Sequence, residues 1–336
     1  DQLKLEIGKI PNDILEKLLS EFSDPIRSEV ITRPGIGEDC AALDLSGDLC
    51  VVTTDPITGA DDEIGTLGIH IALNDLASAG AEPVGLLVTI LAPVDTRLET
   101  IENLIKQLKE VSSAMNIDII GGHTEVTDAV NRLVLSITAI GKVRRDNLIT
   151  TKGAKPGDSI ILTKYAALEG TTILAWLFEE ELTREFGGEF VDSAKNLLNN
   201  ISVVKEGILA AKFGVSCMHD VTEGGVLGAA WEIGSASGYG IEIYKNRIPI
   251  LEETRRICEF LSIDPLKLIS SGSMLITTPN GEELLRILNQ HDIKASEIGC
   301  ITFGKDFILK DDDISVKITM PESDELYKAR KMKGKI

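Results

Sequence analysis

The sequence is short of cysteine and has no long apolar run, and each shortage excludes a class of protein. The five cysteines among 336 residues are scattered and include no C-x-x-C pair, so neither a disulfide framework nor a zinc site is suggested. Apolar runs such as VGLLVTILAP stop well short of the roughly 18 residues that a membrane helix needs, and no basic-then-apolar leader opens the chain. We therefore predict a cytoplasmic protein that does not interact with membranes.

Basic residues are also scarce, and this shortage bears on the choice of partner. Thirty-four lysines and arginines stand against 53 aspartates and glutamates, so the formal net charge is −19. The field of such a protein repels nucleic acid. A small anionic ligand can still bind if divalent cations lie between it and the carboxylates. The composition therefore argues against nucleic-acid binding and permits nucleotide binding through metal.

Three familiar nucleotide-binding motifs are missing as well. The sequence contains no G-x-x-x-x-G-K-[ST] phosphate loop, no G-x-G-x-x-G at the start of a helix and no protein-kinase signature. An ATP site in this chain would therefore have to be built in another way.

Length and periodicity predict two α/β (α+β) domains. At about 150 residues per domain the chain makes roughly two, and a hydrophobic content of 43% can fill two cores. The polar, basic and turn-rich segment 141–158 is expected to connect them, which gives domains 1–150 and 151–336. In the first domain we predict helices at 11–22, 65–79 and 97–114, and strands at 49–54, 84–91, 117–120 and 133–140. In the second we predict strands at 159–163, 273–278 and 297–302, and helices at 166–180, 188–211, 222–235, 251–261 and 281–290.

Three aspartates lie where a carboxylate needs a cation. Asp39 follows a glycine turn, Asp55 is predicted to end a strand, and Asp75 lies in a largely apolar helix, where desolvation is costly without a compensating partner. No lysine or arginine occurs between Arg33 and Arg97. Oxygen ligands without clustered histidine or cysteine favour Mg²⁺, which bridges carboxylates to phosphates and so points to ATP. Taken singly, an aspartate in a loop is more often an ordinary turn acid.

Two glycine-rich segments predict anion-binding turns. Gly121 and Gly122 follow the predicted strand 117–120, so a turn with exposed backbone N–H groups is expected there, although such a pair is more often only a tight turn. In HDVTEGGVLG, Thr222 is predicted to be the N-cap of a helix with Glu223 in its first turn. The alternative for this second segment is a capped packing helix.

Other reactive side chains are predicted to be structural. A single histidine beside an apolar run, such as His219, is more often a hydrogen-bonded core residue than a catalytic base. Cys40 and Cys217 are predicted to be small buried hydrophobic residues rather than nucleophiles.

An ordered set of motifs over about residues 5–320 carries a family resemblance. The set comprises GIGEDCAAL, TTDPITG, LNDLASAGAEP, GGHTEV, KPGDSIILT, LEGTTILA, HDVTEGGVLGAAWEI and SSGSMLIT. The chain resembles the AIR synthetase-related superfamily, which includes thiamine-monophosphate kinase, selenophosphate synthetase and the hydrogenase maturation factor HypE. LEGTTILA and HDVTEGGVLGAAWEI are most similar to the HypE branch.

The resemblance implies a two-domain protomer that binds ATP and Mg²⁺ and forms a homodimer, with strands of the N-terminal domains in a shared barrel. By residue, it implies that Asp39, Asp55 and Asp75 bind metal and that Asp220 and Glu223 are catalytic and position the acceptor. The cofactor-binding residues that it implies are Gly35, Gly37, Thr54, Asn74, Gly121, Gly122, Thr124, Gly224 and Gly225.

Two departures from the family pattern bear on activity. His123 stands where relatives usually carry an acid, so one metal position is expected to be lost or moved to Glu125. HypE carries a C-terminal cysteine that receives the carbamoyl group, whereas the last cysteine here is Cys300, inside IGCITFG. The usual HypE route is therefore not expected for the sequence as it stands.

The function that the resemblance implies is ATP-dependent activation, by phosphoryl transfer, of an oxygen on a small molecule or a carbamoyl group. It also implies a link to hydrogenase maturation and a maturation partner protein. Two alternatives stay open at this point: a thiamine-monophosphate kinase-like enzyme, and a nucleotide-binding partner protein that has lost the chemistry.

Overall fold

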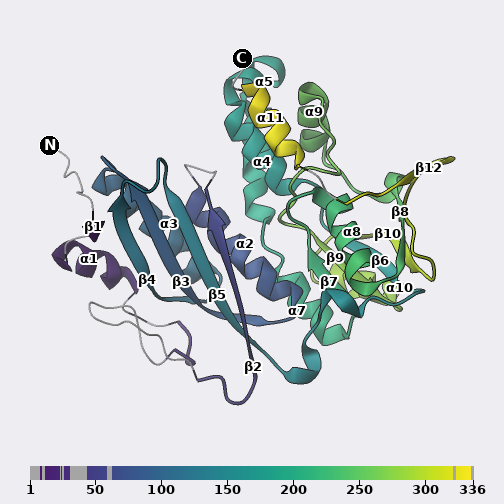
Figure 1. Cartoon of the computed structure of the whole chain (residues 1–336), viewed down its shortest axis with the longest axis horizontal. Coiled ribbons are helices and arrows are strands. Elements are labelled where there is room, and N and C mark those ends of the chain that lie inside the picture. Colours follow the sequence, from purple (N-terminus) through teal and green to yellow (C-terminus); the bar gives the residue numbers. More distant parts are fainter. Residues whose placement is uncertain are drawn as a thin grey trace. The chain divides into compact units, whose positions relative to one another are not determined.

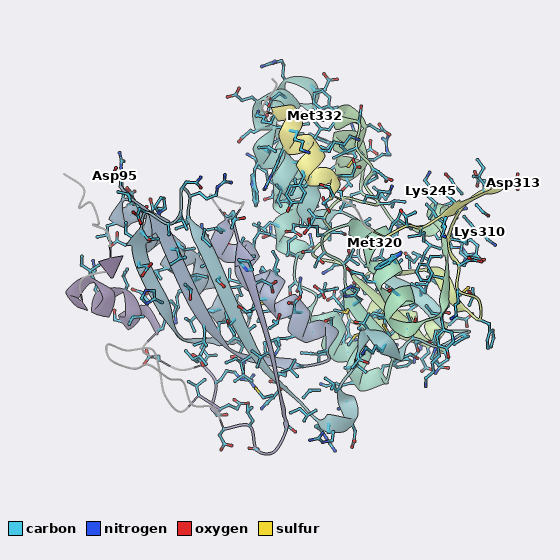
Figure 2. The ribbon with its side chains drawn as sticks, in the orientation of Figure 1. Asp95, Lys245, Lys310, Asp313, Met320 and Met332 are labelled. Carbon is cyan, nitrogen blue, oxygen red and sulfur yellow. The ribbon has the colours of Figure 1, made fainter. Side chains whose placement is uncertain are left out.

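A computed structural model describes residues 8–9, 12–22, 24, 26–30, 44–58, 63–320 and 323–333. The chain divides into two compact units. The first comprises Asp1–Leu76 and Ala81–Asp146, and the second comprises Ala77–Gly80 and Asn147–Ile336. Figure 1 shows a mixed α/β architecture with one sheet in each unit, as the sequence predicts.

The first unit is built on a five-stranded sheet with the order β1-β4-β3-β5-β2. Its pairs are antiparallel except for β3 with β4, which run parallel. The strands are β1 (Gly8–Lys9), β2 (Leu49–Ile57), β3 (Glu82–Pro93), β4 (Asp118–Thr127) and β5 (Val134–Val143). The helices are α1 (Asn12–Leu19), the short η1 (Ser20–Phe22), α2 (Ile64–Ser78) and α3 (Leu98–Ala114).

Buried and less buried residues alternate along the strands, so this sheet has one covered face. Leu135, Ile137 and Ala139 in β5 are fully buried, and Gly68 of α2 packs against the first two. The residues between them in β5 are only half-buried, and Val52 in β2 is 56% exposed. One face of the sheet therefore carries helices and the core, while the other is partly open.

Helix α2 is buried along most of its length, as its composition predicts. Its side chains at Ile69, Leu73 and Leu76 have no exposed surface, and the polar Asn74 is only 1% exposed. A helix that is apolar on almost every side belongs in the interior. Any carboxylate on α2 is therefore held close to the core.

The second unit is built on a seven-stranded sheet with the order β12-β11-β8-β10-β6-β9-β7. Its strands are β6 (Ser159–Thr163), β7 (Cys217–Asp220), β8 (Gly240–Tyr244), β9 (Met274–Thr278), β10 (Ala295–Thr302), β11 (Phe307–Asp311) and β12 (Ile314–Lys317). Its α-helices are α4 (Leu168–Leu177), α5 (Glu179–Phe186), α6 (Gly188–Lys195), α7 (Val204–Phe213), α8 (Gly225–Ser237), α9 (Glu252–Leu261), α10 (Gly281–Gln290) and α11 (Glu325–Lys333). The short helices are η2 (Arg145–Asn147), η3 (Thr151–Gly153), η4 (Asn196–Asn200) and η5 (Lys245–Arg247).

Strand β6 is buried on both faces because helices cover both sides of this sheet. Ile160 and Leu162 belong to a core cluster that includes Val226 and Ile233 of α8. Ile161, which points the other way, belongs to a cluster with Leu284 of α10. Continuous apolar sequence is typical of a strand covered on two sides.

The structure corrects several predicted element boundaries. The helix predicted at 188–211 is divided into α6, η4 and α7, and the one predicted at 166–180 into α4 and the start of α5. The asparagine-rich NLLNN run at 196–200 forms a 3-10 turn rather than a continuous α-helix, since asparagine competes for backbone hydrogen bonds. The sequence did not predict β1, β7, β8, β11, β12 or α11.

Within the residues that the structure describes, no helix is both long enough and apolar enough to span a membrane.

Candidate functional site

A pair of aspartates joins β2 to α2 in the first unit. Asp55 lies on the helix-facing side of β2, opposite Ile137 of β5, and its carboxyl group lies near that of Asp75 on α2. Thr53, two residues earlier on the same side of β2, donates its hydroxyl to Asp75 Oδ2 over 2.6 Å. Asp55 therefore lies inside β2 and does not end the strand, which corrects the predicted boundary.

The electrostatics of this pair are those of two neighbouring acids in a partly buried place. Burial, and after it the negative charge of Asp75, raise the pKa of Asp55 from 3.8 to about 6. The Oδ2 atom of Asp55 is buried and accepts no hydrogen bond from any described residue. A buried carboxylate oxygen without a donor is costly unless a cation binds it.

The pair fits part of a magnesium site. Both side chains offer hard oxygen ligands, and the buried Oδ2 atom of Asp55 has no hydrogen-bond partner among the described residues. The predicted third ligand Asp39, together with Gly35 and Gly37, lies outside the described residues. In the described part of the chain, no group of three or more histidine, cysteine, aspartate or glutamate residues could hold a metal. Of the three predicted metal ligands, the structure therefore describes Asp55 and Asp75.

The glycine pair at 121–122 does not form the predicted turn. Strand β4 continues from Asp118 to Thr127 through both glycines, and its pairing with β3 shifts register between Leu86 and Leu87. Gly122 has a φ of +153°, and a Cβ atom there would lie 1.8 Å from the carbonyl oxygen of Val88. Glycine is required at this position because two backbones approach closely at the irregularity.

The remaining predicted residues of the first unit are spread over both sides of its sheet. Asn74 is buried beside Asp75 in α2. Thr54 is exposed, accepts a hydrogen bond from Thr138 Oγ1 over 2.9 Å and points away from the side of Asp55. Thr124 lies in β4 opposite Ile90. His123 Nε2 lies 2.9 Å from Glu125 Oε2, so these two side chains bind each other in the described structure.

In the second unit, three loops meet at one edge of the sheet. Strand β9 runs antiparallel to both β6 and β7. The loops that follow β6 and β7 therefore lie beside the loop that precedes β9. Ala167 N donates to Ser270 Oγ over 2.7 Å, and Ser270 N donates to Thr222 O over 3.2 Å. Backbone and hydroxyl groups thus hold the three loops to one another.

The HDVTEGG turn belongs to this edge, and its helix begins later than predicted. Helix α8 starts at Gly225, and its N-cap is Gly224, with a φ of +85°, rather than Thr222. A Cβ atom on Gly225 would lie 2.5 Å from Leu266 O. The glycines therefore permit a left-handed turn packed against a neighbouring backbone, and Thr222 contributes its carbonyl oxygen to Gly225 N over 3.1 Å.

Asp220 and Glu223 differ in exposure. Asp220, at the end of β7, is 5% exposed, whereas Glu223 is exposed at the surface of the turn. His219 Nε2 lies 2.5 Å from Glu232 Oε2 on α8, so the histidine is hydrogen-bonded as predicted. Cys217 is fully buried, as predicted, and burial raises the pKa of its thiol to about 12.

Sequence reasoning missed Glu169, a buried acid at the same edge. It lies in the first turn of α4, is 2% exposed and accepts a hydrogen bond from Ser271 N over 3.1 Å. Burial first, and the charges of Asp324 and Glu223 after it, raise its pKa from 4.5 to about 7. The sequence did contain a signal for this residue, because LEGTTILA places one acid in an apolar helix, as the segment around Asp75 does.

Replacing Glu169 with glutamine is expected to change how stability depends on pH. The pKa is raised in the folded state, so the wild-type carboxyl group loses its stabilising contribution as the pH rises through about 7. The Glu169→Gln variant should gain stability relative to the wild type as the pH rises from about 4.5 to about 7, by up to about 3 kcal/mol. Urea denaturation across this range measures the difference, with the exposed Glu185→Gln as control. Parallel curves for wild type and Glu169→Gln would contradict the expectation.

Two family models and close relatives place this architecture in a known class. The N-terminal domain of AIR synthase related proteins matches residues 37–143, and the C-terminal domain of the same proteins matches residues 155–312. A hydrogenase expression/formation protein of Methanocaldococcus jannaschii is 32% identical over 276 residues, which cover 79% of this chain and 80% of that protein. The chain therefore belongs to the hydrogenase expression/formation branch of the AIR synthase-related family, as its motifs indicate. The carbamoyl dehydratase HypE of Rhodobacter capsulatus is 26% identical over 82% of this chain and 79% of that protein.

Solved structures share the fold. HypE of E. coli has a TM-score of 0.79 at 24% identity, covering 95% of this chain and 100% of that one. HypE in complex with ATP has a TM-score of 0.74 at 22% identity, covering 92% and 93%. A HypE–HypF complex contains a chain with a TM-score of 0.68 at 23% identity, covering 83% of this chain and 92% of that one.

Proposed function

We propose that the protein uses Mg²⁺ and ATP to activate the oxygen of a carbamoyl or amide group by phosphoryl transfer, in the maturation of a hydrogenase. The observation that carries the proposal is the Asp55–Asp75 pair, whose buried Oδ2 atom lacks a donor in a chain of this family. Relatives named carbamoyl dehydratase and a solved HypE–ATP complex support both the substrate class and the nucleotide.

The proposed roles divide between metal binding and positioning of the acceptor. Asp55 and Asp75, with Asp39, would hold Mg²⁺, which when bound neutralises charge on the phosphates. Thr53 orients Asp75 through the 2.6 Å hydrogen bond, so the carboxylate is positioned before the ligand arrives. Asp220 and Glu223 would position the acceptor. Catalysis of this kind depends mainly on positioning and on charge neutralisation.

The proposed reaction balances for a thiocarbamate acceptor. The carbonyl oxygen of R–S–C(=O)–NH₂ attacks the γ-phosphorus of ATP, and the bond from that phosphorus to the bridging oxygen breaks, which releases ADP. The nitrogen then loses two protons while the carbon–oxygen bond breaks, so phosphate leaves and R–S–C≡N forms. The acceptor oxygen ends in inorganic phosphate.

The proposed assembly is a homodimer that also works with a maturation partner protein. The partly open face of the first sheet, with Val52 at 56% exposure, supports a dimer interface on that face. The HypE–HypF complex supports a partner of the HypF kind. The described cysteines are all free thiols, namely Cys50, Cys217, Cys258 and Cys300, which supports a reducing, cytoplasmic setting.

The test is turnover of a small thiocarbamate. Purified protein is incubated with Mg²⁺, ATP and S-carbamoyl-N-acetylcysteine, and ADP and the thiocyanate product are measured by mass spectrometry. We expect one ADP for each thiocyanate formed, with no product when EDTA is present. Phosphorylation of thiamine monophosphate instead would support the kinase alternative, and calorimetric ATP binding without any turnover would support the nucleotide-binding partner.

A further inference from the structure

Residues 323–333 fold against the acceptor-side edge of the second unit. Asp324 Oδ2 accepts a hydrogen bond from Gly224 N over 2.7 Å, across 100 positions of sequence. Its other oxygen accepts from Leu326 N over 2.8 Å, at the start of α11. Asp324 is only 2% exposed. One buried carboxylate therefore ties the HDVTEGG turn to α11.

Tyr327, one turn further along α11, contacts the neighbouring residue of the same turn. Its hydroxyl group lies near the Glu223 carboxylate, whose charge raises the pKa of Tyr327. Tyr327 is 43% exposed and Glu223 is also exposed. Asp324 thus binds the backbone of the turn, and Tyr327 lies beside its exposed acidic side chain.

Helix α11 has other anchors that do not involve the turn. Asp264 N donates to Glu325 Oε2 over 3.2 Å, and Lys333 Nζ donates to Glu181 Oε1 over 2.6 Å. Leu326 and Ala329 are buried against the cluster formed by α4, α5, α6 and α9. The bond from Asp324 to Gly224 is therefore additional to those that dock the helix.

The buried position of Asp324 is electrostatically unfavourable. Burial, partly offset by backbone hydrogen bonds from Leu326, Gly224 and Ile269, raises its pKa, and the charge of Glu223 raises it further. The buried acid Glu169 lies close enough to interact with both. Placing a third acid beside two others costs stability that the docking of α11 does not require, since the helix has separate anchors. What Asp324 provides is a fixed Gly224 N–H and, with Tyr327, a fixed Glu223.

We infer that Asp324 and Tyr327 are positioning residues for the acceptor: they hold the Gly224 backbone and the Glu223 carboxylate in the geometry that the acceptor meets. This inference rests on the proposed function, in which Glu223 orients the acceptor. It makes α11 part of the reaction site rather than a helix that only covers the second unit. The acceptor-side turn is then supported from two sides, by Ser270 through Thr222 O and by α11.

Hydrogen exchange tests the positioning without any need for turnover. In Asp324→Asn the neutral amide holds Gly224 N–H less tightly than a carboxylate does. We expect amide exchange at Gly224 to be roughly tenfold faster than in the wild type, while peptides from α11 exchange at the wild-type rate. Unchanged exchange at Gly224 would overturn the inference. Faster exchange along α11 as well would also overturn it, because Asp324 would then be an anchor of the helix.

Kinetics test the consequence for the reaction. Tyr327→Phe removes one exposed hydroxyl group and is compared with Tyr239→Phe, at another exposed tyrosine of the same unit. We expect Tyr327→Phe to lower kcat/KM for S-carbamoyl-N-acetylcysteine by roughly tenfold and to leave the KM for ATP within about twofold of the wild type. Equal kcat/KM values for the two variants would overturn the inference. Retained turnover in Asp55→Asn would instead overturn the proposed function, so the two failures are distinguishable.

Discussion

Replacing Asp55 with asparagine is expected to remove Mg²⁺-dependent ATP turnover and, at the same time, to make the metal-free protein more stable at pH 7.5. Turnover should fall by about 10²–10³-fold, because a charged ligand at the phosphates is lost. ADP release in the assay with S-carbamoyl-N-acetylcysteine measures this loss. The exposed Asp128→Asn, also in the first unit, serves as the matched control.

The gain in stability follows from the sign of the pKa shift. The folded pKa of Asp55 is about 6 and the ordinary value is 3.8, so the wild type is progressively destabilised as the pH rises through 6. One pKa unit is about 1.4 kcal/mol, which bounds the effect near 3 kcal/mol, and solvent screening of this half-buried group reduces it to about 1–2 kcal/mol. Urea denaturation in EDTA measures it. Asp55→Asn with wild-type turnover would refute the role in metal binding, whatever its stability.

Gly122→Ala should lose several kcal/mol of unfolding free energy, whereas Gly121→Ala should lose about 1 kcal/mol or less. At Gly122 the new Cβ atom meets the Val88 carbonyl oxygen at 1.8 Å, and backbone cannot rotate away as a side chain can. At Gly121 the nearest contact is the Leu87 Cδ2 atom at 3.1 Å, which can move. We expect about 3 kcal/mol or more for the first variant, the cost typical of severe overpacking and backbone strain.

Urea denaturation of both glycine variants separates a packing role from a phosphate role. If Gly122→Ala keeps wild-type stability but binds ATP weakly in calorimetry, the glycine serves the ligand rather than the strand pairing. If both variants unfold at the same urea concentration, the close approach of β4 to β3 does not determine which residues are tolerated at position 122. Either result would contradict the packing explanation.

The elements with strong periodicity were predictable from sequence. Helix α3 has apolar residues on one face over 17 residues, and its predicted range of 97–114 differs from the observed one by a single residue. Helix α2 and strand β3 were found for similar reasons, since a buried helix and a buried strand each leave a long apolar run. The family was also predictable, because an ordered set of motifs is more specific than any one of them.

The errors arose where tertiary contacts override local signals. The Gly121–Gly122 pair has the local signature of a turn, yet β4 runs through it. The strand continues because β4 pairs with β3 on both sides of a register shift at this point. Strand β7 has only four residues and its sequence, CMHD, carries no periodicity. Helix α11 is rich in lysine and arginine, and its place in the fold comes from two buried residues and from the bonds of Glu325 and Lys333 rather than from an apolar stripe.

The candidate site was predictable in part for the same reasons. An acid in an apolar helix pointed to Asp75, and its partner Asp55 was found by the absence of nearby positive charge. Glu169 carried the same signal, but its meaning depends on Ser271 and Asp324, which lie 102 and 155 positions away. Sequence patterns of short range cannot report such contacts.

The way in which the HDVTEGG turn is held has a consequence for biosynthesis. Its hydrogen bonds come from Ser270 and Asp324, and Ser270 is in turn bound to Ala167. A chain emerging from the ribosome can form α4 early, whereas β6 has to wait for its paired strands β9 and β10. Of its two partners the turn has only Ser270 until residue 324 has been translated. In the proposed function, the nascent protein therefore gains its acceptor edge only when the second unit is nearly whole.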